Sequence, residues 1–138
     1  MPTAFVARSD SQQGWASDVG LTRHVYKLGL SDGEAKAAVA TLNEESHAGR
    51  NDWTLLAAQT TAETDLDVLL GRVARKEAMV DPTYYPQLRR APGIIKVKLG
   101  NVENHLLVKE ALEGQLPRKA KAPTAAQIAT YLLRLAAG

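Results

Sequence analysis

Hydrophobic positions alternate with other residues in part of the chain, most clearly between residues 24 and 30. The alternation places Val25, Lys27 and Gly29 on one face and Tyr26, Leu28 and Leu30 on the other. A period of two is typical of a β-strand. Shorter apolar runs at residues 3–8, 53–59 and 93–99 also have the composition of strands. The pattern therefore predicts four strands.

Other segments carry apolar residues at every third or fourth position, which predicts helices over residues 32–43, 60–80, 101–113 and from 124 onward. Three of these helices follow a serine or threonine with a glutamate or glutamine three residues later, the spacing of a capping box: Ser31 with Glu34, Thr60 with Glu63, and Thr124 with Gln127. The segment from residue 9 to 20 is polar and contains glycine, so we expect a loop anchored by Trp15.

The order of the elements predicts an α+β fold. We expect a small three- or four-stranded, mostly antiparallel sheet flanked by helices, with an appended C-terminal helix. Residues 1–114 would form the domain, 115–123 a basic linker with two prolines, and 124–138 an amphipathic interaction helix. Because an exposed apolar stripe favours aggregation, we expect this helix to dock on its own domain or on a second copy. Its stripe consists of Ile128, Tyr131, Leu132 and Leu135.

Composition limits the classes of function. The chain has 138 residues, of which 45% are hydrophobic and 23% charged, as in an ordinary globular domain. The absence of cysteine excludes disulfides, thiolate metal sites and cysteine nucleophiles. No apolar run approaches the roughly 18 residues of a membrane span, and the first residues do not resemble a signal peptide. The sequence therefore predicts a cytoplasmic protein without a membrane partner.

The net charge of +2 conceals an uneven distribution. Residues 9–67 contain four basic and ten acidic residues, whereas residues 68–138 contain twelve basic and five acidic residues. Residues 82–102 include Arg89, Arg90, Lys96 and Lys98 and no acid. Such a basic surface is typical of contact with a polyanion, although solvation or pairing within the fold is the commoner explanation of such a distribution.

Phe5-Val6 lies in the first predicted strand and Val25-Tyr26-Lys27-Leu28-Gly29 in the second, and a helix, a strand and a second helix follow them. These two short motifs and the order of the elements resemble the GIY-YIG superfamily, and in particular its phage-type branch. The resemblance covers about residues 3–97. It implies a sheet that begins with two antiparallel strands, and a relationship to enzymes that hydrolyse phosphodiesters in DNA.

The motif is degenerate. The family's enzymes use a tyrosine from each motif strand, an arginine of the first helix and a metal-binding glutamate. Here Phe5 and Lys27 occupy the tyrosine positions, and residues 32–43 contain no arginine. If activity survived, Tyr26 and His47 would be catalytic, and one of Glu63, Asp65 and Asp67 would hold magnesium or manganese. The departures predict reduced or absent cleavage, and in that case no cofactor.

Three functions follow from these observations. The first is a non-catalytic or weakly active GIY-YIG-like domain that binds DNA or another nucleic acid, or serves as an accessory interaction module. The second is an active, metal-dependent DNA endonuclease with a diverged site. The third is a structural subunit of a larger protein assembly. The nucleic-acid contacts expected for the first are Lys27, Arg89, Arg90, Lys96 and Lys98.

Overall fold

The computed structural model describes residues 2–20, 24–80, 93–112, 114 and 123–137. Arg89, Arg90 and nearly all of the expected linker lie outside these residues. None of the helices in the described part of the chain has the length and apolar character needed to span a bilayer.

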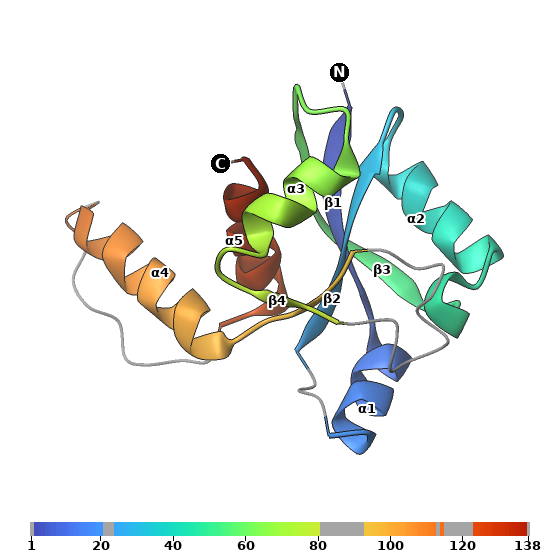
Figure 1. Ribbon diagram of the computed structural model, residues 1–138, viewed down its shortest axis with the longest axis horizontal. Helices are drawn as coiled ribbons and strands as arrows, with labels where there is room; N and C mark the ends of the chain where they lie inside the picture. Colours follow the sequence, from blue (N-terminus) through green and yellow to red (C-terminus); the bar gives the residue numbers. More distant parts are fainter. Residues whose placement is uncertain (1, 21–23, 81–92, 113, 115–122, 138) are drawn as a thin grey trace.

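A five-stranded sheet forms the centre of the molecule (Figure 1). Its strands lie in the order β3-β1-β2-β5-β4, and every neighbouring pair is antiparallel. The α+β prediction is confirmed, and so is the antiparallel pairing of the first two strands. The strands are β1 (Thr3–Ser9), β2 (Val25–Ser31), β3 (Trp53–Thr60), β4 (Ala78–Met79) and β5 (Ile94–Lys96).

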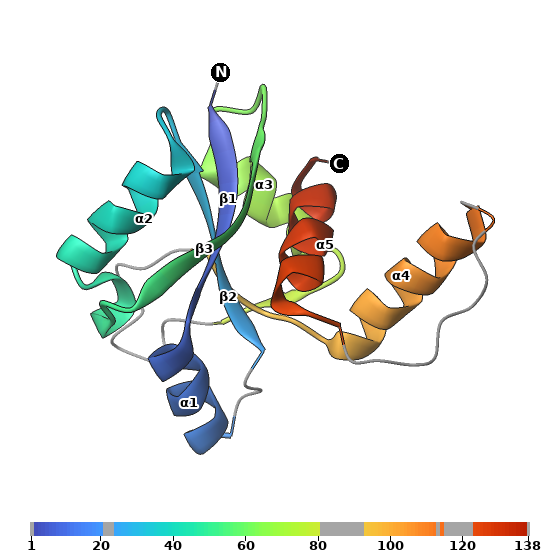
Figure 2. The ribbon, with the colours of Figure 1, turned by 180° about the vertical axis from the view of Figure 1, so that it is seen from behind.

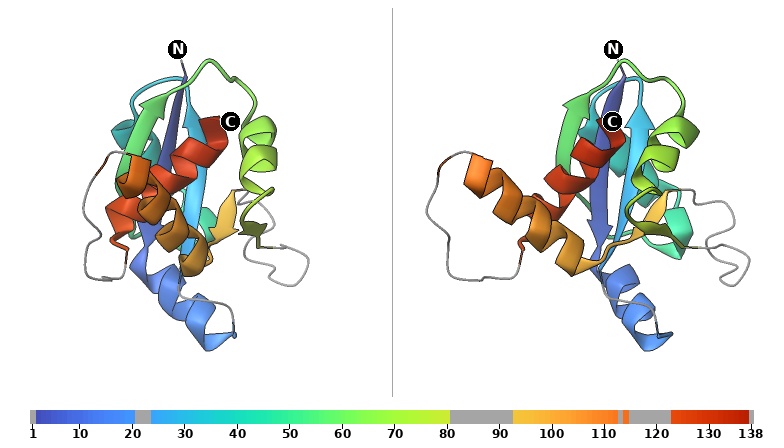
Figure 3. Two further views of the ribbon diagram at one scale, coloured as in Figure 1. Left: turned by 90° about the vertical axis from the view of Figure 1, so that its left-hand side faces the viewer. Right: turned by 60° about the vertical axis from the view of Figure 1, so that its left-hand side comes forward.

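Helices cover both faces of the sheet, so each face has its own apolar core. On one face lie α1 (Asp10–Asp18), α2 (Ala35–Glu44) and the short 3-10 helix η1 (His47–Gly49). The other face is covered by α3 (Leu66–Val73) and α5 (Ala125–Ala137) (Figure 2). The first turns of α4 (Leu99–Leu112) pack beside α5, and the rest of the helix projects away from the sheet (Figure 3).

The C-terminal helix belongs to the main core. The backbone N–H of Gln127 donates to Thr124 Oγ1 at 3.2 Å, and Gln127 Oε1 accepts from the Thr124 N–H at 2.9 Å, which confirms the capping box. The predicted stripe faces β1, β3 and α3: three of its residues are buried and Leu135 is partly buried. Docking on the parent domain is therefore confirmed, and the stripe is not exposed to a second molecule.

The loop expected over residues 9–20 is wrong, because α1 occupies most of it. Ser9 Oγ accepts a hydrogen bond from the Gln12 N–H at 3.1 Å and caps the helix. Gln12 and Ala16 are its buried residues, so the helix has no apolar stripe to reveal it in the sequence. Trp15 is partly buried against the α2-side core, as an anchor would be.

The helix expected over residues 60–80 is shorter than predicted. Asp65 rather than Thr60 caps α3, its Oδ1 accepting from the Asp67 N–H at 2.9 Å. The helix ends at Val73. Residues 78–79 form β4, which pairs with β5, so the sheet has one strand more than the four expected. At the start of α2, Ser31 Oγ accepts from the Gly33 N–H at 3.1 Å and does not complete the expected capping box with Glu34.

The two short motifs of β1 and β2 meet in the sheet. Phe5 and Gly29 are cross-strand partners of β1 and β2. A Cβ atom added at Gly29 would lie 2.3 Å from Cζ of the Phe5 ring. Because Phe5 is buried against α2, its ring has little space to move. Glycine is required here by the aromatic ring that covers it.

Gly29→Ala is therefore expected to lower the free energy of unfolding by about 1–3 kcal/mol, the usual cost of overpacking a core. Urea denaturation of the variant would measure the loss. In a Phe5→Ala background the same substitution should cost much less, because the ring that it meets is gone. An equal cost in the two backgrounds would show that the contact does not explain the glycine.

Candidate functional site

The two expected catalytic side chains lie on opposite faces of the sheet. Tyr26 belongs to the core beneath α3 and α5. His47 lies in η1 and contacts the Trp53 ring on the α2 side, with ring centroids 5.7 Å apart. A shared catalytic site for Tyr26 and His47 has no support in this arrangement.

The expected metal-binding carboxylates order the start of α3. Glu63 Oε1 accepts from the N–H groups of Thr64 and Asp65 at 3.1 and 3.2 Å. Asp65 caps the helix, and Asp67 lies in its first turn. Within the described ranges, no group of three or more histidines and carboxylates could hold a metal ion. Glu63 and Asp65 therefore accept hydrogen bonds from the backbone that leads into α3, and Asp67 carries an acidic charge in the first turn of the helix.

Lys27 lies inside the protein and does not belong to its basic surface. The residue is 4% exposed and pairs with Ala7 in the β1–β2 register, on the face of the sheet that carries α1, α2 and η1. Burial lowers the pKa of the Lys27 ammonium from 10.5 to about 8. The backbone approaches the amine closely, since a Cβ atom at Gly93 would lie 3.2 Å from Lys27 Nζ. A polymer phosphate does not reach the ammonium in this conformation.

His47 and Gln12 are further polar groups on the same face. Burial, and secondly the positive charge of Lys27, lower the pKa of His47 to about 4, so the imidazole is neutral at pH 7. The His47 Nε2 and the side-chain Oε1 and Nε2 of Gln12 are buried without a hydrogen-bond partner in the described part of the chain. The sequence did not identify Gln12, because it lies in the segment expected to be a loop.

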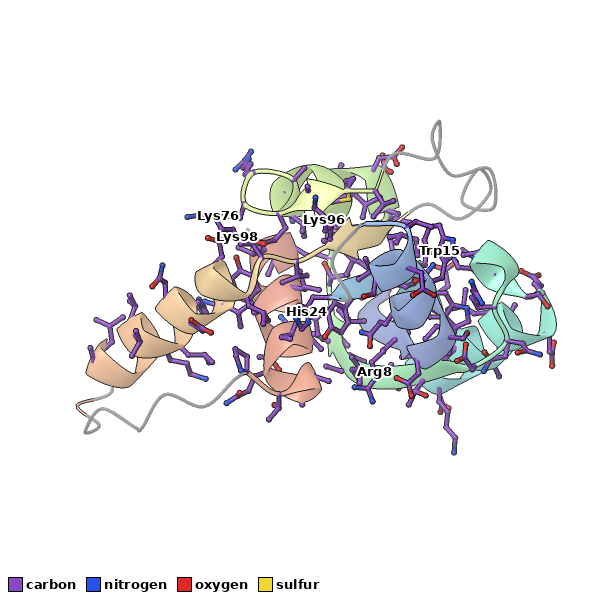
Figure 4. The ribbon with its side chains drawn as sticks, turned by 90° about the horizontal axis from the view of Figure 1, so that it is seen from below. Arg8, Trp15, His24, Lys76, Lys96 and Lys98 are labelled. Carbon is purple, nitrogen blue, oxygen red and sulfur yellow. The ribbon has the colours of Figure 1, made fainter. Side chains whose placement is uncertain are left out.

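Three exposed lysines gather near the start of β4 and the end of β5. We call Lys76, Lys96 and Lys98 the basic edge (Figure 4). Lys96 pairs with Ala78 in the β4–β5 register, and Asn101 Nδ2 donates to the Lys76 carbonyl at 3.2 Å. Arg8 lies farther across the same view and forms an ion pair with Asp10 at 3.3 Å.

Glu77 lies among these lysines but turns inward. It is 3% exposed, and its carboxylate accepts from the Lys98 N–H at 2.8 Å, Asn101 Nδ2 at 3.1 Å and the Tyr131 hydroxyl at 3.4 Å. Burial, followed by the Glu77 charge and hydrogen bond, raises the pKa of Tyr131 to about 12. The described residues between 68 and 102 include no other acid. The Glu77 carboxylate thus links the residue before β4 to α4 and α5. The side chains of the three lysines are exposed to the solvent.

Sequence reasoning identified Lys96 and Lys98 and missed Lys76. Lys76 lies in the segment that was expected to be helical up to residue 80. The sequence did not indicate whether its side chain would point toward the sheet or toward the solvent. The signal was present in Arg75-Lys76, two consecutive basic residues shortly before an apolar pair.

Comparison of the chain with protein-family models, curated proteins and solved structures found no match. The resemblance to the GIY-YIG superfamily therefore stays a prediction based on the sequence motif and the order of the elements.

Proposed function

We propose that the protein is a nucleic-acid-binding module that contacts phosphates through the basic edge. The observation that carries the proposal is the gathering of three exposed lysines around a glutamate whose carboxylate is turned inward. A cluster of exposed cations whose neighbouring acid is buried attracts a polyanion and releases its counterions on binding. Arg75, also exposed, precedes Lys76 and would extend the same positive field.

Binding without efficient cleavage is the form of this function that we favour. Phosphodiester hydrolysis needs groups that stabilise charge and position water on one surface. The sheet separates Tyr26 from His47, and the carboxylates at the start of α3 hold backbone N–H groups. A degenerate GIY-YIG-like domain would then retain a phosphate-binding surface without its reaction.

The triple variant Lys76→Gln/Lys96→Gln/Lys98→Gln is expected to bind a short DNA duplex at least tenfold more weakly at low salt. Fluorescence anisotropy at several salt concentrations would measure the affinity. Each phosphate contact contributes about 0.9 to the slope of log K against log salt for B-DNA, so the slope should decrease by about 2–3.

The matched control replaces three exposed basic residues elsewhere by glutamine: Lys36, Lys109 and Arg134. Both variants lose three charges, so an effect of net charge alone would weaken them equally. Equal weakening, or no binding by the wild-type protein at low salt, would contradict the basic edge as the binding surface. Arg89→Gln/Arg90→Gln would separately test the expected contacts outside the described residues.

A further inference from the structure

A cleft lies between α3 and α5, on the α5-covered face of the sheet. Its volume is about 390 Å³, within the roughly 300–1,000 Å³ of small-molecule sites. Its lining includes a floor of four buried apolar residues together with Glu63 and Arg72. We call this the α3–α5 cleft; the floor residues are Ala4, Leu69, Leu133 and Ala136.

Two opposite charges that line the cleft form a long ion pair. Arg72 Nη2 lies 3.9 Å from Glu63 Oε2, beyond the roughly 2.7–2.9 Å of a charge-assisted hydrogen bond. The side chains of Arg72 and Glu63 are 31% and 26% exposed, so both charges are accessible to a small molecule.

In each charged group, the atom that does not face the opposite charge forms hydrogen bonds to the backbone. Arg72 Nη1 donates to the Ala136 carbonyl at 2.9 Å, in the last turn of α5. Glu63 Oε1 accepts from the two backbone N–H groups at the start of α3. These bonds fix the positions of the guanidinium and the carboxylate, while Nη2 and Oε2 are left facing one another. Fixed, partly exposed charges lose little conformational freedom when a ligand binds.

We propose that the α3–α5 cleft binds a small zwitterion with an apolar side chain, of the class of a free apolar α-amino acid. Its carboxylate would accept from Arg72 Nη2 and its ammonium would donate to Glu63 Oε2. The apolar side chain would lie on the floor of the cleft. A ligand with a single charge would leave one of the two protein charges opposed only by the other, at 3.9 Å.

An NMR titration of the full chain with L-leucine tests the proposal. We expect saturable shifts of the amide resonances that line the cleft, including those of Thr61 and Ala137. N-acetyl-leucine lacks the ammonium and leucinamide lacks the carboxylate, and each should bind at least tenfold more weakly than leucine. Glu63→Gln should abolish the preference for leucine over N-acetyl-leucine, and Arg72→Gln the preference for leucine over leucinamide.

Arg75→Gln is the matched control, because Arg75 is exposed and does not line the cleft. It should leave leucine binding unchanged. Glu63→Gln preserves the shape of the side chain, so it remains informative even if Arg72→Gln loosens α5. Absence of saturable shifts with leucine, or equal binding of leucine and its two singly charged analogues, would overturn the proposal.

Discussion

A chain that ends at Pro123, and so lacks α5, is expected to be unfolded in buffer. Six residues of α5 are buried, and four of them have large side chains: Ile128, Tyr131, Leu132 and Leu133. Burying such a side chain contributes about 1.5–3 kcal/mol as an upper range. Their combined loss is comparable to the 5–15 kcal/mol by which whole domains are stable.

Far-ultraviolet circular dichroism during heating would show the loss as a missing cooperative transition. A milder test is Leu132→Ala, at a residue with no exposed surface, which is expected to lower the free energy of unfolding by about 2–5 kcal/mol. Thr130→Ala, at an exposed position of the same helix, is the matched control and should change it by less than about 0.5 kcal/mol. A cooperative transition in the truncated chain would mean that α5 is not part of the core.

Elements with a clear hydrophobic period could be predicted from the sequence. The α5 stripe at positions i, i+3, i+4 and i+7 indicated its length and buried face, and alternation in β2 indicated which residues share a side. In contrast, α1 buries Gln12 and Ala16, a pair that no hydrophobicity pattern reveals. β4 is two residues long and forms because β5 offers it a partner, so its stability comes from residues distant in the sequence.

The candidate sites divide in the same way. Lys96 and Lys98 could be named as candidate contacts from the sequence, because a run of basic residues without acids is visible there. The inward turn of Glu77 was not, because it depends on Asn101 and Tyr131, which are brought to it by α4 and α5. The α3–α5 cleft likewise exists only when residues of β1, α3 and α5 meet. Alternation placed Lys27 on the correct face, but only the helices packed over that face make it buried.

Lys27→Met is expected to raise the stability of the protein at pH 7 by up to about 3 kcal/mol. Lys27 is charged there, although its surroundings lower its pKa from 10.5 to about 8, and one pKa unit corresponds to about 1.4 kcal/mol. The thioether fills a similar volume without a charge to bury. Chemical denaturation of the wild-type protein and the variant at pH 7 would measure the difference.

The dependence on pH separates this electrostatic cost from a change in packing. Between pH 8 and 10.5 the unfolded chain keeps the Lys27 proton that the folded chain has lost, so wild-type stability should rise with pH. Measurements should stop near pH 10, because the pKa of Tyr131 is raised to about 12 and its titration lowers stability at higher pH.

The variant Lys27→Met should lack the rise, whereas Lys36→Met, at an exposed lysine, should keep it. A rise of equal size in Lys27→Met and the wild-type protein would assign the pH dependence to another group. The same variant removes the charge that acts on His47, so the pKa of His47 should increase from about 4 in an NMR titration. An unchanged His47 pKa would show that the ammonium and the imidazole do not interact across the α2 face of the sheet.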